Sequence, residues 1–541
     1  MNNTIYKYDV PKNEPVLQYE KGSKERELLE KELKRQSSNQ VDIPLIIDGK
    51  EVRTGKTQKI IMPHDKNHIL GQYHQAGPEE VKLAIDSAIK ARKIWENFSW
   101  ADRVAVNLKI AELISTKYRA LMNASTMLGQ SKNAYQAEID SACEVVDFLR
   151  FNAHFLSNVY HEQPLCIPGI LNKLDYRPLE GFVFAVSPFN FTAIASNLSM
   201  APILMGNSVV WKPASTSILS NYYLAQIYKE AGLPDGVINF IPGSGSTIGN
   251  EVFSNPNFTG IHFTGSTGTF NHIWKTIGEN LPTYRSYPKL VGETGGKDFV
   301  FVHPSADKEA VAVALVRGAF EYQGQKCSAA SRAYIPESLW PYIKSAMGDM
   351  LSEIKMGDVQ DFSNFVNAVI DETSFDNIMK HIQIANNSNE AEVVFGGKGD
   401  KTVGFFIQPT VIVTTNPKFI TMEEELFGPV LTIYLYKDKD VEETLHICDE
   451  TSPYALTGAI FSQDRDELIK ASKILRYAAG NIYYNDKPTG AVVGQQPFGG
   501  SRSSGTNDKS GSYLNLLRWV NPRTIKETLS PATDYKYPFM M

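Results

Sequence analysis

The feature that most constrains the fold is a regular succession of short apolar segments in the middle of the chain. Candidate strands occupy residues 182–186, 208–211, 237–241 and 261–263, with helix-like stretches between them, and their starts lie 26, 29 and 24 residues apart. That spacing is typical of β-α-β units, because parallel strands need a long crossover connection, usually a helix. The sequence therefore predicts a Rossmann-like, doubly wound α/β sheet, whose ligands bind beyond the carboxyl ends of the strands.

A second series of alternating segments follows. Residues 299–302 are a candidate strand, and a helix that continues to Phe320 should begin shortly after it, with Ser305 as its N-cap. At 541 residues the chain is also longer than one hydrophobic core usually serves. We therefore predict two α/β domains. The first consists of residues 1–159 and 179–295, and the second of residues 296–510.

The first part of the chain carries local signals for an arm, a hairpin and several helices. Residues 1–20 mix prolines with charged residues and should form an extended arm, and a charged helix should begin after Ser23. The Asp-Gly pair at residues 48–49 lies between two apolar segments and predicts a tight β-turn, because such a turn needs positive φ angles. Pro78 is typical of a first helical turn, and long helices should continue to about Tyr160.

The charge balance favours a small-molecule partner. The formal net charge is -6 and the pI is about 6.0. The chain therefore lacks the basic surface expected of a protein that binds nucleic acid or an anionic membrane. Its longest apolar runs are also far shorter than the roughly 20 residues needed to cross a bilayer.

Cysteine usage bears on the compartment. The four cysteines lie far apart with no C-x-x-C pair, which excludes a disulfide scaffold and favours a reducing compartment. No signal-peptide pattern opens the chain, and its first twenty residues contain acids and lysines but no arginine, unlike a mitochondrial presequence. We expect a cytoplasmic protein, or one of the mitochondrial matrix if a presequence was removed. No residue is assigned to a metal.

The loops that follow the four strands should lie together at one edge of the sheet. They begin at residues 187, 212, 242 and 264. A helix entered through Gly265 and Ser266 offers free backbone N–H groups and the positive end of its dipole to a pyrophosphate. Lys212, held between a tryptophan and a proline, would supply a charged donor to a ribose or phosphate oxygen, and an ordinary surface lysine is the alternative.

Two further residues could carry chemistry. Cys327 lies in the segment Phe-Glu-Tyr-Gln-Gly-Gln-Lys-Cys-Ser-Ala-Ala-Ser-Arg and is a candidate nucleophile, although a single cysteine is more often a small buried hydrophobe. Glu144 is similarly ambiguous, because Phe148, Phe151 and Phe155 follow it at helical spacing and such a stripe usually faces a core. The local patterns leave both residues open.

Seven motifs, in order along the chain, resemble those of the aldehyde dehydrogenase superfamily. They are Phe189-Asn190, Trp211-Lys212-Pro213, Phe263-Thr264-Gly265-Ser266, Glu293-Thr294-Gly295-Gly296-Lys297, Gly324-Gln325-Lys326-Cys327, Glu425-Leu426-Phe427-Gly428-Pro429 and Pro497-Phe498-Gly499-Gly500. The resemblance extends from about residue 40 to the end of the chain. Residues 187–192, 320–329 and 485–498 are similar to the branch of the superfamily that oxidises glutamate 5-semialdehyde to glutamate in proline breakdown.

This resemblance implies roles for the catalytic residues. Cys327 would attack the aldehyde, and the thioester formed after hydride transfer would be hydrolysed. The Asn190 amide and the Cys327 backbone N–H would stabilise the oxyanion, and Glu293 would be the general base. A free cysteine has a pKa of about 8.5, so activation of the thiol by local dipoles or by a base is expected.

The resemblance also implies NAD as the cofactor, bound by the first domain, with the second domain catalytic. Glu425 would hold the nicotinamide ribose, and Phe427 would pack beside the nicotinamide. Many NAD-preferring relatives have glutamate where this chain has Ser215, so a preference for NAD over NADP follows from the subfamily alone. The implied cofactor-binding residues are Ser187, Pro188, Lys212, Ser215, Gly245, Thr264, Gly265, Ser266, Glu425 and Phe427.

For the substrate, the resemblance places Ser328 and the backbone of Gly490 and Ala491 around a carboxylate. It places Glu144 near an ammonium group and Phe191 against the aliphatic part of the semialdehyde. A dehydrogenase of another semialdehyde, such as succinate semialdehyde, is an alternative, and so is a member of the fold without activity.

Family members associate through a strand flap, which here would be residues 160–178, together with the C-terminal segment 511–541. The tail from Trp519 is polar and contains prolines and tyrosines, which predicts an arm on a neighbouring subunit rather than part of a core. A homodimer or a larger homo-oligomer is therefore expected.

Overall fold

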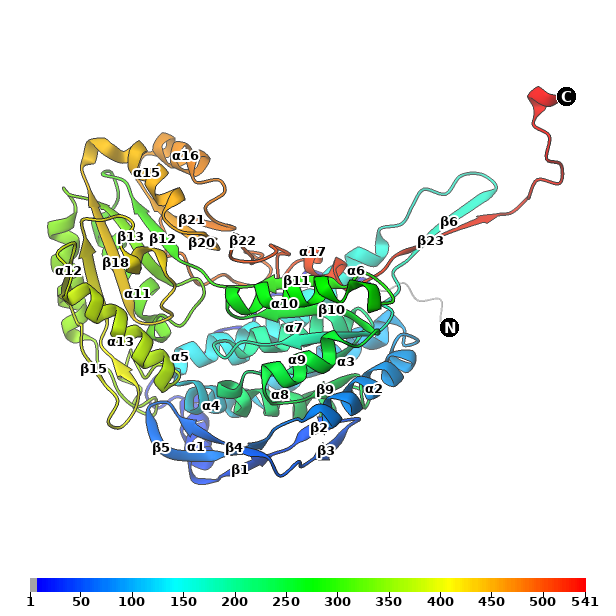
Figure 1. Ribbon diagram of the computed structural model, residues 1–541, viewed down its shortest axis with the longest axis horizontal. Helices are drawn as coiled ribbons and strands as arrows, with labels where there is room; N and C mark the ends of the chain where they lie inside the picture. Colours follow the sequence, from blue (N-terminus) through cyan, green and yellow to red (C-terminus); the bar gives the residue numbers. More distant parts are fainter. Residues whose placement is uncertain (1–6) are drawn as a thin grey trace.

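The computed structural model describes residues 7–541 and contains two large sheets, each packed between helices (Figure 1). The first sheet has seven strands in the order β11-β10-β7-β8-β9-β2-β3. They are β11 (Lys289–Glu293), β10 (Phe258–Thr264), β7 (Phe182–Val186), β8 (Ser208–Lys212), β9 (Ile238–Phe240), β2 (Leu45–Ile47) and β3 (Lys50–Val52). The strands from β11 to β9 are parallel, and β2 joins β9 antiparallel. The predicted doubly wound sheet is confirmed.

Apolar cores cover both faces of this sheet. The helices of one face are α2 (Pro78–Trp95), α9 (Gly245–Phe253) and α10 (Thr267–Glu279). Those of the other face are α7 (Thr192–Leu204) and α8 (Ile218–Glu230), against which α3 (Trp100–Ser115), α4 (Arg119–Gln130) and α6 (Val145–His161) pack. Each crossover helix brings the chain back to the end of the sheet where the next parallel strand begins. The carboxyl ends of the parallel strands therefore lie together at the opposite edge. Within residues 7–541, no helix combines the length and apolar character needed to cross a membrane.

Several local predictions for the first domain are confirmed. The helix α1 (Lys24–Ser38) begins after Ser23, whose side chain accepts from the Arg26 N–H. The turn between β2 and β3 has Asp48 and Gly49 at φ values of 52° and 70°. The helix start depends on a side-chain cap and the turn on positive φ angles. Both requirements are local, so short sequence motifs were sufficient to predict both features.

A smaller sheet in the same region was not anticipated. It has the order β1-β5-β4 and consists of β1 (Val41–Ile43), β4 (Thr57–Met62) and β5 (Asp65–His74). The pairing of β4 with β5 shifts register twice, and such irregularities interrupt the alternation of inward and outward side chains that identifies a strand. The sequence signal for these strands is correspondingly weak.

The second sheet also has seven strands, in the order β14-β17-β18-β13-β12-β20-β21. They are β14 (Ala391–Phe395), β17 (Thr410–Thr414), β18 (Val430–Tyr436), β13 (Ala330–Pro336), β12 (Asp298–Val302), β20 (Thr457–Phe461) and β21 (Asn481–Tyr484). Its helices are α11 (Lys308–Phe320), α12 (Trp340–Glu353), α13 (Glu372–Asn386), α15 (Val441–Glu450) and α16 (Arg465–Ile474). Separate apolar cores lie on its two faces, which supports the interpretation of residues from 296 onward as a second α/β domain.

The predicted cap of α11 is wrong. Asp307, not Ser305, is the N-cap, and its carboxylate accepts from the N–H groups of Glu309 and Ala310. The Ser305 hydroxyl instead accepts from the N–H groups of Gln463 and Asp464. The local pattern assigned the Ser305 side chain to the helix, but this side chain binds the turn after β20 instead.

The strand β6 (Ile170–Asp175) lies in the predicted flap and pairs antiparallel with β23 (Arg523–Thr528). This ribbon projects from the body of the molecule, and the C-terminal tail continues beyond it (Figure 1). The prediction that the arm begins at Trp519 is wrong, because Trp519 is fully buried and its ring lies 4.7 Å from that of His262. The helix α17 (Tyr513–Leu517) also packs on α6, so residues 511–520 belong to the body of the first domain.

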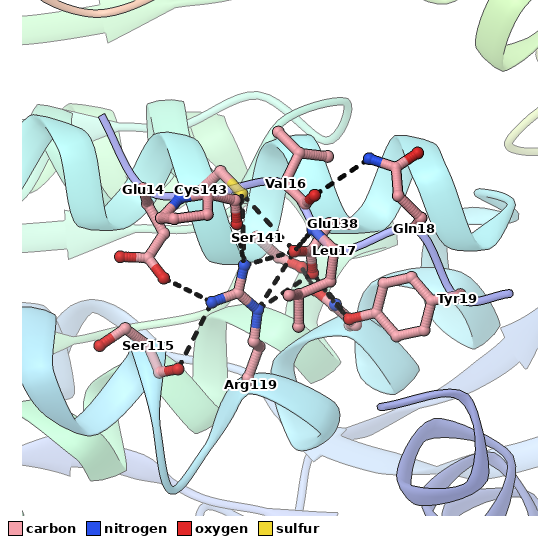
Figure 2. A network of polar contacts seen from close by, with 12 residues as sticks. Glu14, Val16, Leu17, Gln18, Tyr19, Ser115, Arg119, Glu138, Ser141 and Cys143 are labelled. Carbon is pink, nitrogen blue, oxygen red and sulfur yellow. Dashed lines mark hydrogen bonds and ion pairs between the residues drawn. The ribbon is translucent and has the colours of Figure 1, made fainter. Parts of the chain in front are cut away.

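The N-terminal region is not a free arm over its described part, and residues 1–6 lie outside the described residues. Residues 13–19, called the strap here, cross the surface of α4 and the π-helix Glu138–Glu144. Figure 2 shows Arg119 between the carboxylates of Glu14 and Glu138. Glu138 also accepts from the Leu17 N–H (2.9 Å) and the Tyr19 hydroxyl (2.7 Å). Buried charged partners thus fix the strap to the body of the protein.

Candidate active site

Cys327 lies in the turn that joins α11 to β13. In this turn Tyr322 and Gln323 have φ values of 52° and 56°, a conformation that is unfavourable for residues with side chains. The Gln323 side-chain amide donates to the carbonyl oxygens of Ser131 (3.0 Å) and Ala368 (2.8 Å). These buried hydrogen bonds hold the strained turn, so the position of the thiol is determined by contacts from several segments of the chain.

Two cavities meet at Cys327. The larger has a volume of about 300 Å³, and Glu293 also lines it. The smaller is lined by Glu425 and Phe427 in addition to Cys327. The thiol is therefore open to a ligand in the larger cavity, and it also borders the smaller one beside Glu425 and Phe427.

Asn190 is the other candidate for the oxyanion site. It follows β7 and is 3% exposed. Its side-chain amide donates to the carbonyl oxygen of Gln325, at 3.2 Å, two residues before Cys327. The structure therefore brings the Asn190 donor group to the turn that carries the thiol, although the two residues come from different domains.

Glu293 ends β11, beside the carboxyl end of β10. Its carbonyl oxygen accepts from the Gly265 N–H at 3.2 Å, so the predicted base adjoins the predicted cofactor loop. Burial raises the pKa of Glu293 to about 7, and the nearby Asp508 carboxylate adds to the increase. A carboxyl with that pKa can accept and release a proton near neutral pH, as a general base requires.

The thiol itself differs from expectation. Burial raises the pKa of Cys327 well above its usual value, and the carboxylates of Glu293 and Asp298 add to the increase. The expected lowering of the pKa by local dipoles is not observed, because burial outweighs the backbone contact that acts in that direction. Proton removal from Cys327 therefore requires a base, and Glu293, the carboxylate that acts most strongly on the thiol, lines the larger cavity with it.

The cofactor loops lie at the shared edge of the first sheet, as predicted. Burial lowers the pKa of Lys212 to about 8, and its ammonium group donates only to the Pro213 carbonyl oxygen among the described contacts (3.2 Å). The Thr264 hydroxyl is buried without a partner among the described residues. A Cβ atom at Gly245 would contact only Lys212, which leaves room at this loop for another molecule.

The remaining cofactor candidates in the first domain lie in the loops that follow β7, β8 and β10. Ser266 caps α10 by accepting from the Thr269 N–H. Ser187 accepts from the Trp211 ring N–H at 3.0 Å, Pro188 follows it, and Ser215 is exposed at the loop that Lys212 begins. An unpaired hydroxyl, a weakly paired lysine and an open glycine loop at a helix N-terminus fit a bound nucleotide.

Glu425 and Phe427 come from the second domain. The Glu425 carboxylate accepts from the Gly296 N–H at 2.9 Å, and burial raises its pKa to about 7. A Cβ atom at Gly295 would lie 2.3 Å from a Glu425 oxygen, which explains the glycine there. Phe427 has a φ of 56° and contacts the ring of Phe189 edge-on at 5.7 Å.

All five residues predicted to bind substrate line the larger cavity. They are Glu144, Phe191, Ser328, Gly490 and Ala491. The hydroxyl groups of Ser328 and Thr489 are hydrogen-bonded at 2.8 Å. Burial raises the pKa of Glu144 well above its usual value, and the Asp140 carboxylate adds to the increase. Glu144 ends the π-helix, a rare geometry that is frequent at functional sites.

Sequence reasoning missed two contributors to this cavity. The buried Lys132 ammonium donates to Asp140 at 2.7 Å and lies 4.2 Å from the centre of the Phe191 ring. Asp140 also accepts from the Ala193 N–H at 2.8 Å, so this ion pair positions the start of α7. The strap residue Asn13 lines the cavity directly, whereas Lys132 acts on it through Phe191. No local pattern reveals either contribution, because Phe191 and Val493, the residues through which they act, lie far along the chain from them.

Comparison with known proteins identifies the family. The model described as "Aldehyde dehydrogenase family" matches residues 51–525. The chain belongs to this family. The fold and the aldehyde dehydrogenase activity implied by the seven motifs are thereby confirmed.

Individual relatives of this aldehyde dehydrogenase cover nearly its full length. A protein from Dictyostelium discoideum called "Delta-1-pyrroline-5-carboxylate dehydrogenase, mitochondrial" is 55% identical over 534 residues, which is 98% of this chain and 96% of the relative. A Bos taurus protein of the same name is 48% identical over 529 residues, 98% of this chain and 94% of the relative. The solved structure of the Mycobacterium tuberculosis delta-pyrroline-5-carboxylate dehydrogenase bound with NAD is 45% identical and covers 100% of both chains with a TM-score of 0.96.

Proposed function

We propose that this chain oxidises L-glutamate 5-semialdehyde, which is in equilibrium with 1-pyrroline-5-carboxylate, to L-glutamate with NAD. The observation that carries the proposal is one cavity that joins Cys327 and Glu293 to Ser328, Gly490 and Ala491. The names of the Dictyostelium and bovine relatives support the same substrate, and the NAD-bound Mycobacterium structure supports the same cofactor.

The chemistry begins at Cys327. Removal of its proton by Glu293 gives a thiolate, whose sulfur forms a bond to the aldehyde carbon. The negative charge that develops on the aldehyde oxygen is stabilised by the Asn190 amide and the Cys327 backbone N–H. When bound, NAD accepts the hydride that leaves this carbon.

Glu293 acts again in the second half of the reaction. Loss of hydride leaves a thioester on Cys327. Glu293 first releases the thiol proton to solvent and then, as a carboxylate, takes a proton from water as the water attacks the thioester carbonyl. The sulfur leaves, and the acid is released. A pKa of about 7 suits Glu293 for both proton transfers.

The far end of the cavity suits an amino acid head group. The Ser328 hydroxyl and the backbone N–H groups of Gly490 and Ala491 would bind the carboxylate, and Gly490 has a φ of 96° that a side chain would strain. Phe191 would cover the aliphatic part. Glu144 would lie near the ammonium group, and a positive charge there would favour its ionised form.

A substrate profile tests the proposal against the alternatives. We expect NADH formation with glutamate semialdehyde and a lower kcat/KM with succinate semialdehyde, because the latter offers no ammonium group to Glu144. A higher kcat/KM for succinate semialdehyde would contradict the substrate assignment, and no turnover of any aldehyde would identify a member without activity. The same assay with NADP tests the cofactor preference, since the exposed Ser215 cannot repel a 2'-phosphate.

We further propose that two copies associate through the ribbon of β6 and β23. The ribbon projects from the body, and Leu165, Ile167 and Leu171 near it are exposed. Light scattering after gel filtration should give at least twice the 60.3 kDa mass of one chain. A mass of one chain at micromolar concentration would contradict this. A mitochondrial location, which the names of two relatives state for those proteins, would suit the free cysteines if that compartment is reducing.

A further inference from the structure

The larger cavity contains more acidic than basic side chains. Its acidic residues are Glu14, Glu144, Asp147, Glu293 and Glu321, and its basic residues are Lys326 and Lys487. Glu14 is paired with Arg119 and Arg150, and burial raises the pKa of Glu144 and Glu293. A carboxylate that enters the cavity is repelled by those of these groups that are ionised, unless a positive charge compensates the repulsion. Backbone N–H groups and a hydroxyl provide hydrogen bonds but no net charge.

One of the two lysines is already neutralised. The Lys326 ammonium forms a buried ion pair with Glu321 at 3.0 Å. Lys487 differs, because the described residues provide no ion pair and no side-chain hydrogen bond to its ammonium group. The Glu321 carboxylate also interacts electrostatically with Lys487, but among the described residues Lys487 is the lysine of this cavity without an ion-pair partner.

The position of Lys487 also fits a carboxylate. A Cβ atom built on Gly490 would lie 3.1 Å from the Lys487 ammonium nitrogen and would contact no other heavy atom within 4 Å. The ammonium group thus lies directly beside the backbone of Gly490. Of the two residues between them in sequence, Thr489 is hydrogen-bonded to Ser328. One turn of chain therefore brings together a charge, a hydroxyl pair and backbone N–H groups.

We propose that Lys487 is a specificity-determining residue whose ammonium group binds the α-carboxylate of the semialdehyde. This inference rests on the proposed function, because it assigns a further donor to the carboxylate end of that substrate. The Ser328 hydroxyl and the backbone N–H groups at this end orient the carboxylate. Lys487 supplies the positive charge that attracts it. Aldehydes without a carboxylate gain nothing from it.

The test compares Lys487→Met with wild type on two aldehydes, glutamate semialdehyde and propanal. Hydrogen bonds to a charged group contribute enough that their loss should lower kcat/KM for glutamate semialdehyde about ten- to hundredfold. We expect the loss to appear mainly in KM, with kcat/KM for propanal changed less than about twofold. Lys487→Arg should recover part of the loss, and Lys418→Met, at an exposed lysine outside the cavity, should match wild type.

A binding measurement keeps the test independent of turnover. Calorimetry with L-glutamate, the product, should show a ten- to hundredfold weaker Kd for Lys487→Met than for wild type, while NAD binding and the thermal transition stay unchanged. Equal losses for both aldehydes, or an unchanged Kd for glutamate, would overturn the role of Lys487. Failure of the wild-type protein to oxidise glutamate semialdehyde would instead overturn the proposed function.

Discussion

The pKa of Glu293 leads to a specific pH dependence. Burial places this pKa at about 7 rather than at the 4.5 of an exposed glutamate. The general base must be ionised to accept a proton, so activity should fall as the pH decreases through about 7. With that pKa, roughly one tenth of the base is ionised at pH 6 and roughly nine tenths at pH 8.

The same shift affects stability in the opposite direction. A carboxyl with a raised pKa in the folded state favours the protonated form, so folding is most favourable below about pH 4.5 and loses this contribution as the pH rises to about 7. A shift of 2.5 units corresponds to about 3 kcal/mol. Glu293→Gln should therefore raise the free energy of unfolding at pH 8 by an amount on the order of 3 kcal/mol, while abolishing thioester hydrolysis.

Ester hydrolysis without cofactor isolates this step. A nitrophenyl ester acylates Cys327 and releases nitrophenolate in a burst, and the slower steady state reports hydrolysis of the thioester. We expect the steady-state rate to rise with pH around a midpoint of about 7 in wild type, and Glu293→Gln to lose it. Glu425→Gln is the matched control, because its pKa is also about 7 but its carboxylate does not line the larger cavity.

Two results would refute this reasoning. The first is a steady-state rate that does not change between pH 6 and pH 8. The second is a midpoint near pH 7 that persists in Glu293→Gln and disappears in Glu425→Gln. That result would show that Glu425, and not Glu293, is the group whose ionisation controls the rate.

Three further predictions concern other parts of the site. Cys327→Ala should abolish oxidation but leave NAD binding intact in a fluorescence titration, and remaining turnover would exclude it as the nucleophile. Glu138→Ala removes one partner of a buried ion pair and should destabilise the first domain by about 3–5 kcal/mol, seen as a lower Tm, whereas Glu372→Ala, at an exposed pair, should cost less than about 1 kcal/mol. Asn13→Ala removes hydrogen bonds to Asp147 and Val493 in the cavity wall and should raise KM for glutamate semialdehyde severalfold with kcat unchanged, and an unchanged KM would contradict a role of the strap in forming this wall.

The elements that sequence reasoning found are those whose signals are local. The strand 182–186 and the start of α10 at Ser266 follow from apolar periodicity and from a side-chain cap. The turn at Asp48 follows from the φ angles that it needs. The cofactor candidates of the first domain also lie together, because the loops that follow parallel strands meet at one edge of a sheet. The meeting of this edge with Cys327 and Glu425 from the second domain followed from the family resemblance, not from a local pattern.

The elements that it missed depend on partners distant in sequence. Trp519 belongs to a polar segment, yet the ring of His262 and the surrounding core bury it. Serine is a common N-cap residue, but the Ser305 hydroxyl accepts a hydrogen bond from the Gln463 N–H in a distant turn. The π-helix that ends at Glu144 has no amino-acid pattern that distinguishes it from an α-helix. Tertiary contacts override local preference in each of these cases.

The strap also has a consequence for biosynthesis. The Asn13 side-chain amide donates to the Val493 carbonyl oxygen at 2.8 Å across 480 positions, and the Gln495 amide returns a hydrogen bond to Asn13 at 2.9 Å. The strap is therefore synthesised long before the partners that it binds. Closing so long a loop adds only about 0.6 kcal/mol of entropy for each doubling of its length, so the separation delays the contact more than it weakens it. Until that contact forms, a nascent chain can fold its first sheet while its substrate cavity still lacks one wall.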